Sequence, residues 1–159
     1  MRALNRRTLY LSLLLAFICQ LLPWSGIALT ARPDFVLLVL IYWLFRAPHL
    51  CNIGTAWFAG LFIDLSSGGL FGQSALAYAL TAFLALTYQR RLTLFNIWQQ
   101  AAYVFVLLVF NQAALLVLKL FAGGENPGWS YFYPCITGIV LWMFVIFSRI
   151  GIEGHPDKD

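Results

Sequence analysis

The stretch that decides the fold is residues 97–120, which read IWQQAAYVFVLLVFNQAALLVLKL. Lys119 is the only charged residue in it. An α-helix of roughly 20 predominantly apolar residues is long enough to cross the hydrocarbon core of a bilayer. The stretch therefore predicts a membrane-spanning helix.

The composition of the whole chain extends this prediction. Hydrophobic residues make up 62% of the sequence and charged residues 10%, with a mean hydropathy of +0.81, whereas soluble domains carry roughly 25% charged residues. The 159 residues have room for about six spans of roughly 20 residues each. We expect a single integral membrane domain over residues 1–159, without an extramembrane domain.

Clusters of charged residues, Pro, Gly and Asn divide the apolar sequence into segments, because the backbone can turn at such places without leaving polar groups in lipid. These divisions predict an all-α membrane protein, a bundle of about six transmembrane helices at residues 8–27, 34–47, 52–65, 73–88, 97–120 and 131–148. The second and third segments are short, so each either crosses a thinned bilayer or belongs to a re-entrant hairpin.

The distribution of positive charge predicts the orientation. With the N-terminus in the cytoplasm and six spans, only Arg32 and Lys119 lie outside. The cytoplasmic side then holds Arg2, Arg6, Arg7, Arg46, Arg90, Arg91, Arg149 and Lys158. Lys and Arg favour cytoplasmic loops, so we expect both termini in the cytoplasm.

Aromatic residues at two depths have different expected roles. Tyr42 and Trp43 lie near the end of a predicted helix, as interfacial anchors do. Trp57 and Trp142 lie deeper, where we expect them to pack between helices.

Several classes of function find no support in the sequence. The net charge of +4 is dispersed rather than clustered, so nucleic acid is not an expected partner. Cys19, Cys51 and Cys135 have neither paired nor metal-ligand spacing, and we expect no metal or other cofactor. Because no catalytic constellation or phosphate-binding Gly loop is recognisable, we do not expect an enzyme.

Asp64 is the one acid inside an apolar run. A charged side chain at the bilayer centre costs roughly 2.5 to 3.5 kcal/mol on insertion scales, so this carboxylate should face protein or water. One interpretation is a helix-end residue that bonds to the turn at residues 66–69; the other is a proton or ion path. We favour the first.

Small residues recur at helical spacing in the third and fourth predicted helices. They are Ala56 and Gly60, followed at the same spacing by Asp64, and then Ala75, Ala79 and Ala82. Such faces allow two helices to approach closely in a membrane. We expect these two helices to meet across the turn at residues 68–72.

Two further groups of polar residues are candidates for binding. Pro48 and His49 form a predicted cytoplasmic turn, in which His49 could contact a partner or titrate near neutral pH, although a solvated loop residue is the simpler interpretation. Asn111 and Gln112 lie midway along the fifth helix, where hydrogen bonding to neighbouring helices is favoured over a substrate site.

Several short motifs follow one another along the chain: Arg32-Pro33, Tyr42-Trp43, Pro48-His49, Gly54, Gly60, Asp64, Gly68 and Gly72. In this order they resemble the rod shape-determining protein MreD family of Gram-negative bacteria. The resemblance covers almost the whole chain and is densest from Arg32 to Ala85. It marks these residues as candidates for structural or partner-binding roles.

The resemblance implies an inner-membrane scaffold of the elongation machinery, which organises peptidoglycan synthesis in rod-shaped cells. The implied partners are an MreC-like single-span protein, the actin-like MreB, the polymerase RodA and a class B penicillin-binding protein. It carries over no catalytic residue. The sequence is also similar to the six-helix substrate-binding subunits of energy-coupling-factor transporters, so the alternative function is that of a small-molecule transporter or substrate-binding subunit.

Overall fold

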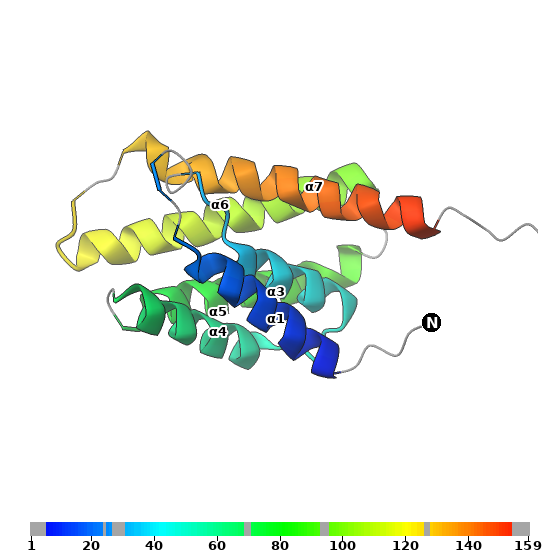
Figure 1. Ribbon diagram of the computed structural model, residues 1–159, viewed down its shortest axis with the longest axis horizontal. Helices are drawn as coiled ribbons and strands as arrows, with labels where there is room; N and C mark the ends of the chain where they lie inside the picture. The colour runs from blue at the N-terminus through cyan, green and yellow to red at the C-terminus, as the bar shows by residue number, and fades with distance from the viewer. Residues whose placement is uncertain are drawn as a thin grey trace, which may run out of the picture.

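Every regular element in the described part of the chain is a helix (Figure 1). The computed structural model describes residues 6–23, 25–26, 31–68, 71–92, 96–125 and 128–153, without the side chains of 89–92 and 149–153. The elements are α1 (Arg6–Leu21), α3 (Phe35–Arg46), α4 (Ile53–Ser67), α5 (Gln73–Leu92), α6 (Ile97–Phe121), the 3-10 helix η1 (Trp129–Phe132) and α7 (Tyr133–Glu153). The predicted all-α class is confirmed.

Two stretches among the described residues are long and apolar enough to cross a membrane. They are Ile97–Phe121, with a mean hydropathy of 2.3, and Trp129–Ser148, with 1.8. At 12 residues, α3 extends only about 18 Å at 1.5 Å per residue, against a hydrocarbon core of roughly 30 Å. Full spanning by the other four helices stays a prediction.

The first helix is shorter than predicted. Its last residue is Leu21, whereas the sequence analysis extended the helix to residue 27. The next residue, Leu22, precedes Pro23, and a residue before proline is sterically pushed away from the helical conformation. Pro23 was therefore a visible stop signal inside an otherwise apolar run.

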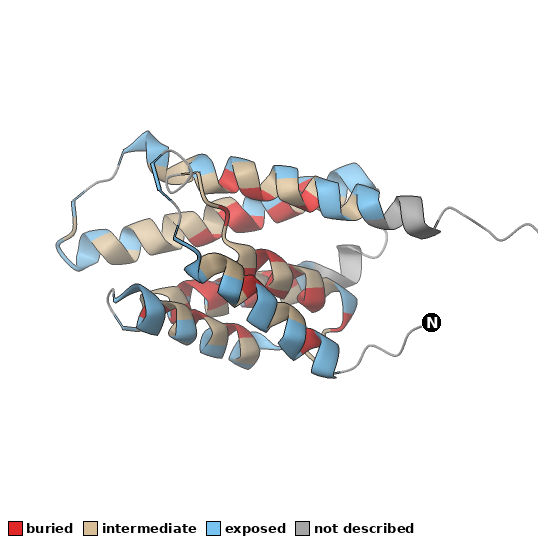
Figure 2. Cartoon of the chain, in the orientation of Figure 1, coloured by how far each residue is buried: buried red, intermediate tan, exposed pale blue. Residues whose placement is uncertain are grey.

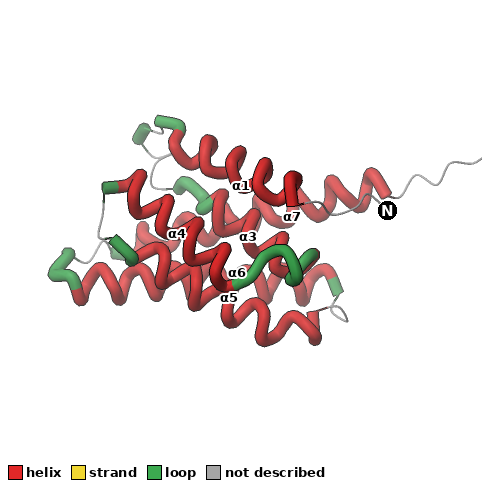
Figure 3. Tube along the Cα trace, turned by 90° about the horizontal axis from the view of Figure 1, so that it is seen from below, coloured by secondary structure: helices red, strands yellow, loops and turns green. Residues whose placement is uncertain are grey.

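The helix α3 lies at the centre of the packing. It contacts α1, α5 and α7, while α4 packs along α5 and α6 along α7, and the connections lie at the ends of the helices (Figures 1 and 3). Seven of its twelve residues are buried, among them Leu40 and Ile41. A helix that is apolar on nearly all sides belongs in such a position.

The outer surface of the fold is also apolar. Exposed residues lie along the outward faces of the helices (Figure 2), and large hydrophobic side chains are prominent among them. Examples are Leu11, Leu14 and Leu15 on α1, Phe58 and Phe62 on α4, and Val140 and Phe144 on α7, all more than half exposed. A soluble monomer rarely presents such extended apolar patches.

Two tryptophans are not where the sequence placed them. Trp43, expected as an interfacial anchor, is buried within the bundle, and its Nε1 donates to Ser12 Oγ of α1 at 2.8 Å. Trp57 faces outward, 42% exposed, and packs edge to face on Phe58, because the opposite, small-residue face of α4 meets α5. Trp142 is buried in edge-to-face contact with Tyr42 and Phe45, as predicted.

Candidate functional site

The carboxylate of Asp64 caps the start of α5. It accepts backbone N–H bonds from Gly72 at 2.9 Å, from Ser74 at 2.9 and 3.1 Å, and from Ala75 at 3.3 Å. The first N–H groups of a helix have no partner within the helix, and its N-terminus carries partial positive charge. These N–H groups can therefore stabilise a carboxylate that is buried away from water. These partners lie beyond the 66–69 turn that we expected, so the carboxylate joins α4 to α5.

Gly60 lies one helical turn before Asp64 and touches the backbone of α5. A Cβ atom added at this position would lie 2.5 Å from the carbonyl oxygen of Ser74 and 2.6 Å from both N and Cα of Ala75. The predicted contact between the small faces of these helices is confirmed at this point. Gly60 sets the distance at which Asp64 reaches the N–H groups of α5.

The other candidate glycines have different surroundings. Gly68 ends α4 in the left-handed conformation with φ of 64°, and Gly72 precedes α5 with φ of 93°, conformations that residues with a Cβ rarely adopt. Gly54 is exposed on the first turn of α4, and an added Cβ would meet nothing within 4 Å. No internal contact explains a glycine at position 54.

The Arg32-Pro33-Asp34 segment joins α1, α3 and α5 at the end of the bundle that also holds Asp64. Half-buried Arg32 donates through Nη1 to the carbonyl oxygen of Gln20 at 2.9 Å, and Pro33 is buried. Asp34 caps α3 by accepting from the N–H of Leu37 at 3.2 Å. The hydroxyl of Tyr78 on α5 donates to the same carboxyl group.

Sequence reasoning missed Asp34 and Tyr78 as a pair. Tyr78 is 1% exposed, and its hydroxyl finds the acceptor that a buried tyrosine usually needs. The available signal was an acid directly after Pro33 at a predicted helix start, a common N-cap position. Nothing in the sequence connected it with a residue 44 positions away.

Amides in the middle of α6 bond to neighbouring elements. Asn111 Oδ1 accepts from the hydroxyl of Thr81 on α5 at 3.4 Å, and Gln112 Nε2 donates to the carbonyl oxygen of Tyr131 at 2.9 Å. Asn111, Gln112 and Asp34 also line a cavity of about 10 Å³. A cavity of roughly this size holds about one water molecule. The structural interpretation of both amides fits these contacts.

The turn between α3 and α4 lies at the opposite end of the bundle. Its residues Pro48 and His49 are half-buried and exposed, respectively. Next to them, burial raises the pKa of the Cys51 thiol, whose contact with Thr55 Oγ1 at 3.2 Å opposes that shift. His49, like Asn52, is an exposed polar residue of this turn, remote from Gly60 and Asp64.

Most candidate residues therefore fall into three groups rather than one site, while Pro48, His49 and Gly54 lie outside all three. Gly60, Asp64 and Gly72 lie at the α4–α5 contact, and Arg32 with Pro33 lies at the start of α3. A third group is central: Trp43 reaches α1, and Tyr42 contacts Trp142 of α7. Each group makes contacts between helices, so its role in this chain is to hold the helices of the bundle together.

An all-helical fold with an apolar outer surface, whose buried carboxylates are satisfied by its own backbone and side chains, has the build of an integral membrane protein. The chain belongs to the MreD family: the model of the rod shape-determining protein MreD matches residues 1–148. The chain is 30% identical to the rod shape-determining protein MreD of Haemophilus influenzae over 139 residues, covering 86% of this chain and 85% of that relative.

Membership of this family makes the chain a membrane protein of the rod-shape machinery, with a role in determining cell shape. The family is a shape-determining structural family rather than a known enzyme family. No solved structure matches the chain. The similarity to energy-coupling-factor subunits stays a prediction.

Proposed function

We propose that the chain is a scaffold in the bacterial inner membrane that holds components of the elongation machinery together and so organises peptidoglycan synthesis. Its proposed partners are an MreC-like single-span protein and, directly or through it, MreB, RodA and a class B penicillin-binding protein. Family membership supports the general role. The observation that carries the scaffold mechanism is that buried polar groups form hydrogen bonds between the helices of the bundle.

The buried carboxylates and Asn111 serve contacts within the bundle, whereas the buried Nε1 of Trp142 has no hydrogen-bond partner among the described residues. Asp64 caps α5, Asp34 joins α3 to α5, and Asn111 meets Thr81. Placing a polar group in lipid costs free energy. Here hydrogen bonds between helices offset that cost, and the same bonds fix the positions of the helices. The cavity of about 10 Å³ beside Asp34 and the pocket of about 160 Å³ beside Arg6 are both below the roughly 300 to 1,000 Å³ of small-molecule pockets. Both observations favour a scaffold over a transporter subunit.

The proposed topology has six spans with both termini in the cytoplasm. Reporter fusions that read the compartment should give cytoplasmic signals at Arg90 and after Lys158, and periplasmic signals at Arg32 and Glu125. The physical reason is that this topology places eight Lys and Arg residues in the cytoplasm and two outside, in line with their preference for cytoplasmic loops. A periplasmic signal after Lys158 would rule out an even number of spans.

Cell shape tests the function directly. In the bacterium that carries this chain, depletion should turn rods into spheres and redistribute new peptidoglycan, seen with a fluorescent D-amino acid, away from the lateral wall. Re-expression should restore width and lateral labelling. A chain carrying Gly54→Leu should accumulate as well as the unaltered one, since an added Cβ at position 54 meets nothing within 4 Å, and its rescue of cell shape then shows whether this exposed position contacts a partner. Cells that stay rod-shaped throughout depletion would refute the proposed role.

A further inference from the structure

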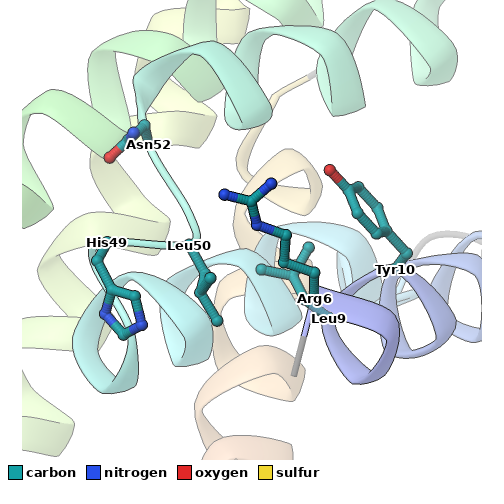
Figure 4. Close-up of a pocket in the computed structure, with 6 residues that line it drawn as sticks. All are labelled: Arg6, Leu9, Tyr10, His49, Leu50 and Asn52. Carbon is teal, nitrogen blue, oxygen red and sulfur yellow. The ribbon is translucent and has the colours of Figure 1, made fainter. Parts of the chain in front are cut away.

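A basic pocket lies where the start of α1 meets the turn between α3 and α4. The pocket has a volume of about 160 Å³ and is lined by Arg6, Leu9, Tyr10, His49, Leu50 and Asn52. Figure 4 shows the guanidinium of Arg6 directed toward the side of the pocket that holds Asn52, with Tyr10 beside it and His49 beyond Leu50. It is at the opposite end of the bundle from Asp64.

The lining fits a phosphate group. Arg6 offers a planar, permanently charged guanidinium suited to phosphate oxygens. Asn52 and Tyr10 supply neutral donors, His49 adds a ring N–H at the rim, and the lining contains no carboxylate. Asn52 is also the N-cap of α4, so the partly positive start of that helix lies next to the pocket.

The surroundings of the pocket indicate what carries the phosphate. Leu9 and Leu50 form its apolar walls. From Tyr10, the same face of α1 continues with exposed Leu14 and Leu21, at helical spacing, and these are surfaces for acyl chains in a membrane. A basic site at the end of a membrane helix, next to lipid-facing leucines, matches the division of a phospholipid into an anionic head and apolar tails.

We propose that this pocket binds the phosphodiester head group of an anionic phospholipid. Arg6 contacts the phosphate oxygens, Asn52 and Tyr10 donate to the head group, and the acyl chains lie along α1. In the proposed orientation the lipid belongs to the cytoplasmic leaflet, where the negative surface potential favours such contacts. The bound lipid would fix the start of α1 against the turn between α3 and α4.

Native mass spectrometry of the full chain, purified in neutral detergent, tests this inference. The chain should retain one phosphatidylglycerol more tightly than phosphatidylcholine. Arg6→Gln should weaken phosphatidylglycerol retention about fivefold, the change expected for loss of one basic contact at a membrane surface. His49→Ala, which removes the ring N–H at the rim, should weaken it about twofold, the loss of a weak neutral hydrogen bond.

Arg7→Gln is the matched control, because it removes the same charge from the neighbouring exposed residue that does not line the pocket. It should leave retention unchanged. Equal losses for Arg6→Gln and Arg7→Gln would mean general surface attraction and overturn the proposal, as would no loss for Arg6→Gln. If millimolar inorganic phosphate displaces the lipid completely and binds as tightly, the ligand is free phosphate rather than a lipid. The readout is independent of partner capture and cell shape, so it can fail while the scaffold function stands.

Discussion

Gly60→Leu is expected to lower the membrane abundance of the chain about tenfold, the range in which a loss of 1 to 3 kcal/mol acts on a marginally stable protein. Even a Cβ at position 60 would lie 2.5 to 2.6 Å from backbone atoms of Ser74 and Ala75. Backbone cannot yield as a flexible side chain does, so α4 and α5 must separate. Asp64, one turn further on, then loses its reach to α5.

The matched control for this change is Gly54→Leu. It places the same side chain on the same helix, but at a position where an added Cβ meets nothing within 4 Å. Immunoblots of membrane fractions compare the two variants with the unaltered chain. We expect near-normal abundance for Gly54→Leu. If Gly60→Leu instead accumulates normally and only partner capture is lost, position 60 belongs to an interface rather than to internal packing.

Asp64→Leu is expected to have a comparably large effect on stability. It removes the acceptor of three backbone N–H groups, those of Gly72, Ser74 and Ala75. A buried donor left without a partner costs roughly 1 to 3 kcal/mol, so the total should be about 3 kcal/mol or more. Thermal unfolding in detergent should show a clearly lowered Tm.

Asp64→Asn separates charge from hydrogen bonding. The amide oxygen can still accept the N–H bonds made to Oδ2 of Asp64. The amide NH2 replaces Oδ1, so the bond from Ser74 to that oxygen is lost together with the attraction to the helix N-terminus, roughly 1 kcal/mol. Its Tm should lie between those of the unaltered chain and Asp64→Leu. Ser66→Leu, exposed near the same helix end, should change Tm little. An Asn variant that is normally stable but as inactive as the Leu variant would show that the charge has a function beyond packing.

The existence and starts of the helices could be predicted because they depend on local sequence. Apolar runs bounded by charged residues, Pro, Gly and Asn predicted the starts of α4, α5 and α6 to within a residue or two. The meeting of α4 and α5 was also predictable, because the short turn after Gly68 brings two small faces together. Local signals of this kind need no knowledge of distant contacts.

Contacts between distant segments could not be predicted in the same way. The bond between Tyr78 and Asp34 depends on α3 packing against α5. The burial of Trp43 and the exposure of Trp57 were not predictable, because lipid and protein interior are equally apolar and hydrophobicity does not show which face of a helix points inward. For Asp64 the sequence indicated a hydrogen bond near the end of its own helix. It did not show that the carboxylate would accept from the first N–H groups of α5.

Capture of partners from membranes tests the scaffold mechanism most directly. Tagged full-length chain, solubilised from the bacterium that carries it and purified in mild detergent, should retain an MreC-like single-span protein in a fixed ratio, along with other elongation components. Gly54→Leu, expected to accumulate normally, and His49→Gln should capture the single-span protein undiminished if the recognition surface lies elsewhere in the membrane. A chain that retains no elongation component and instead binds a small metabolite tightly would contradict the scaffold and favour the transporter-subunit alternative.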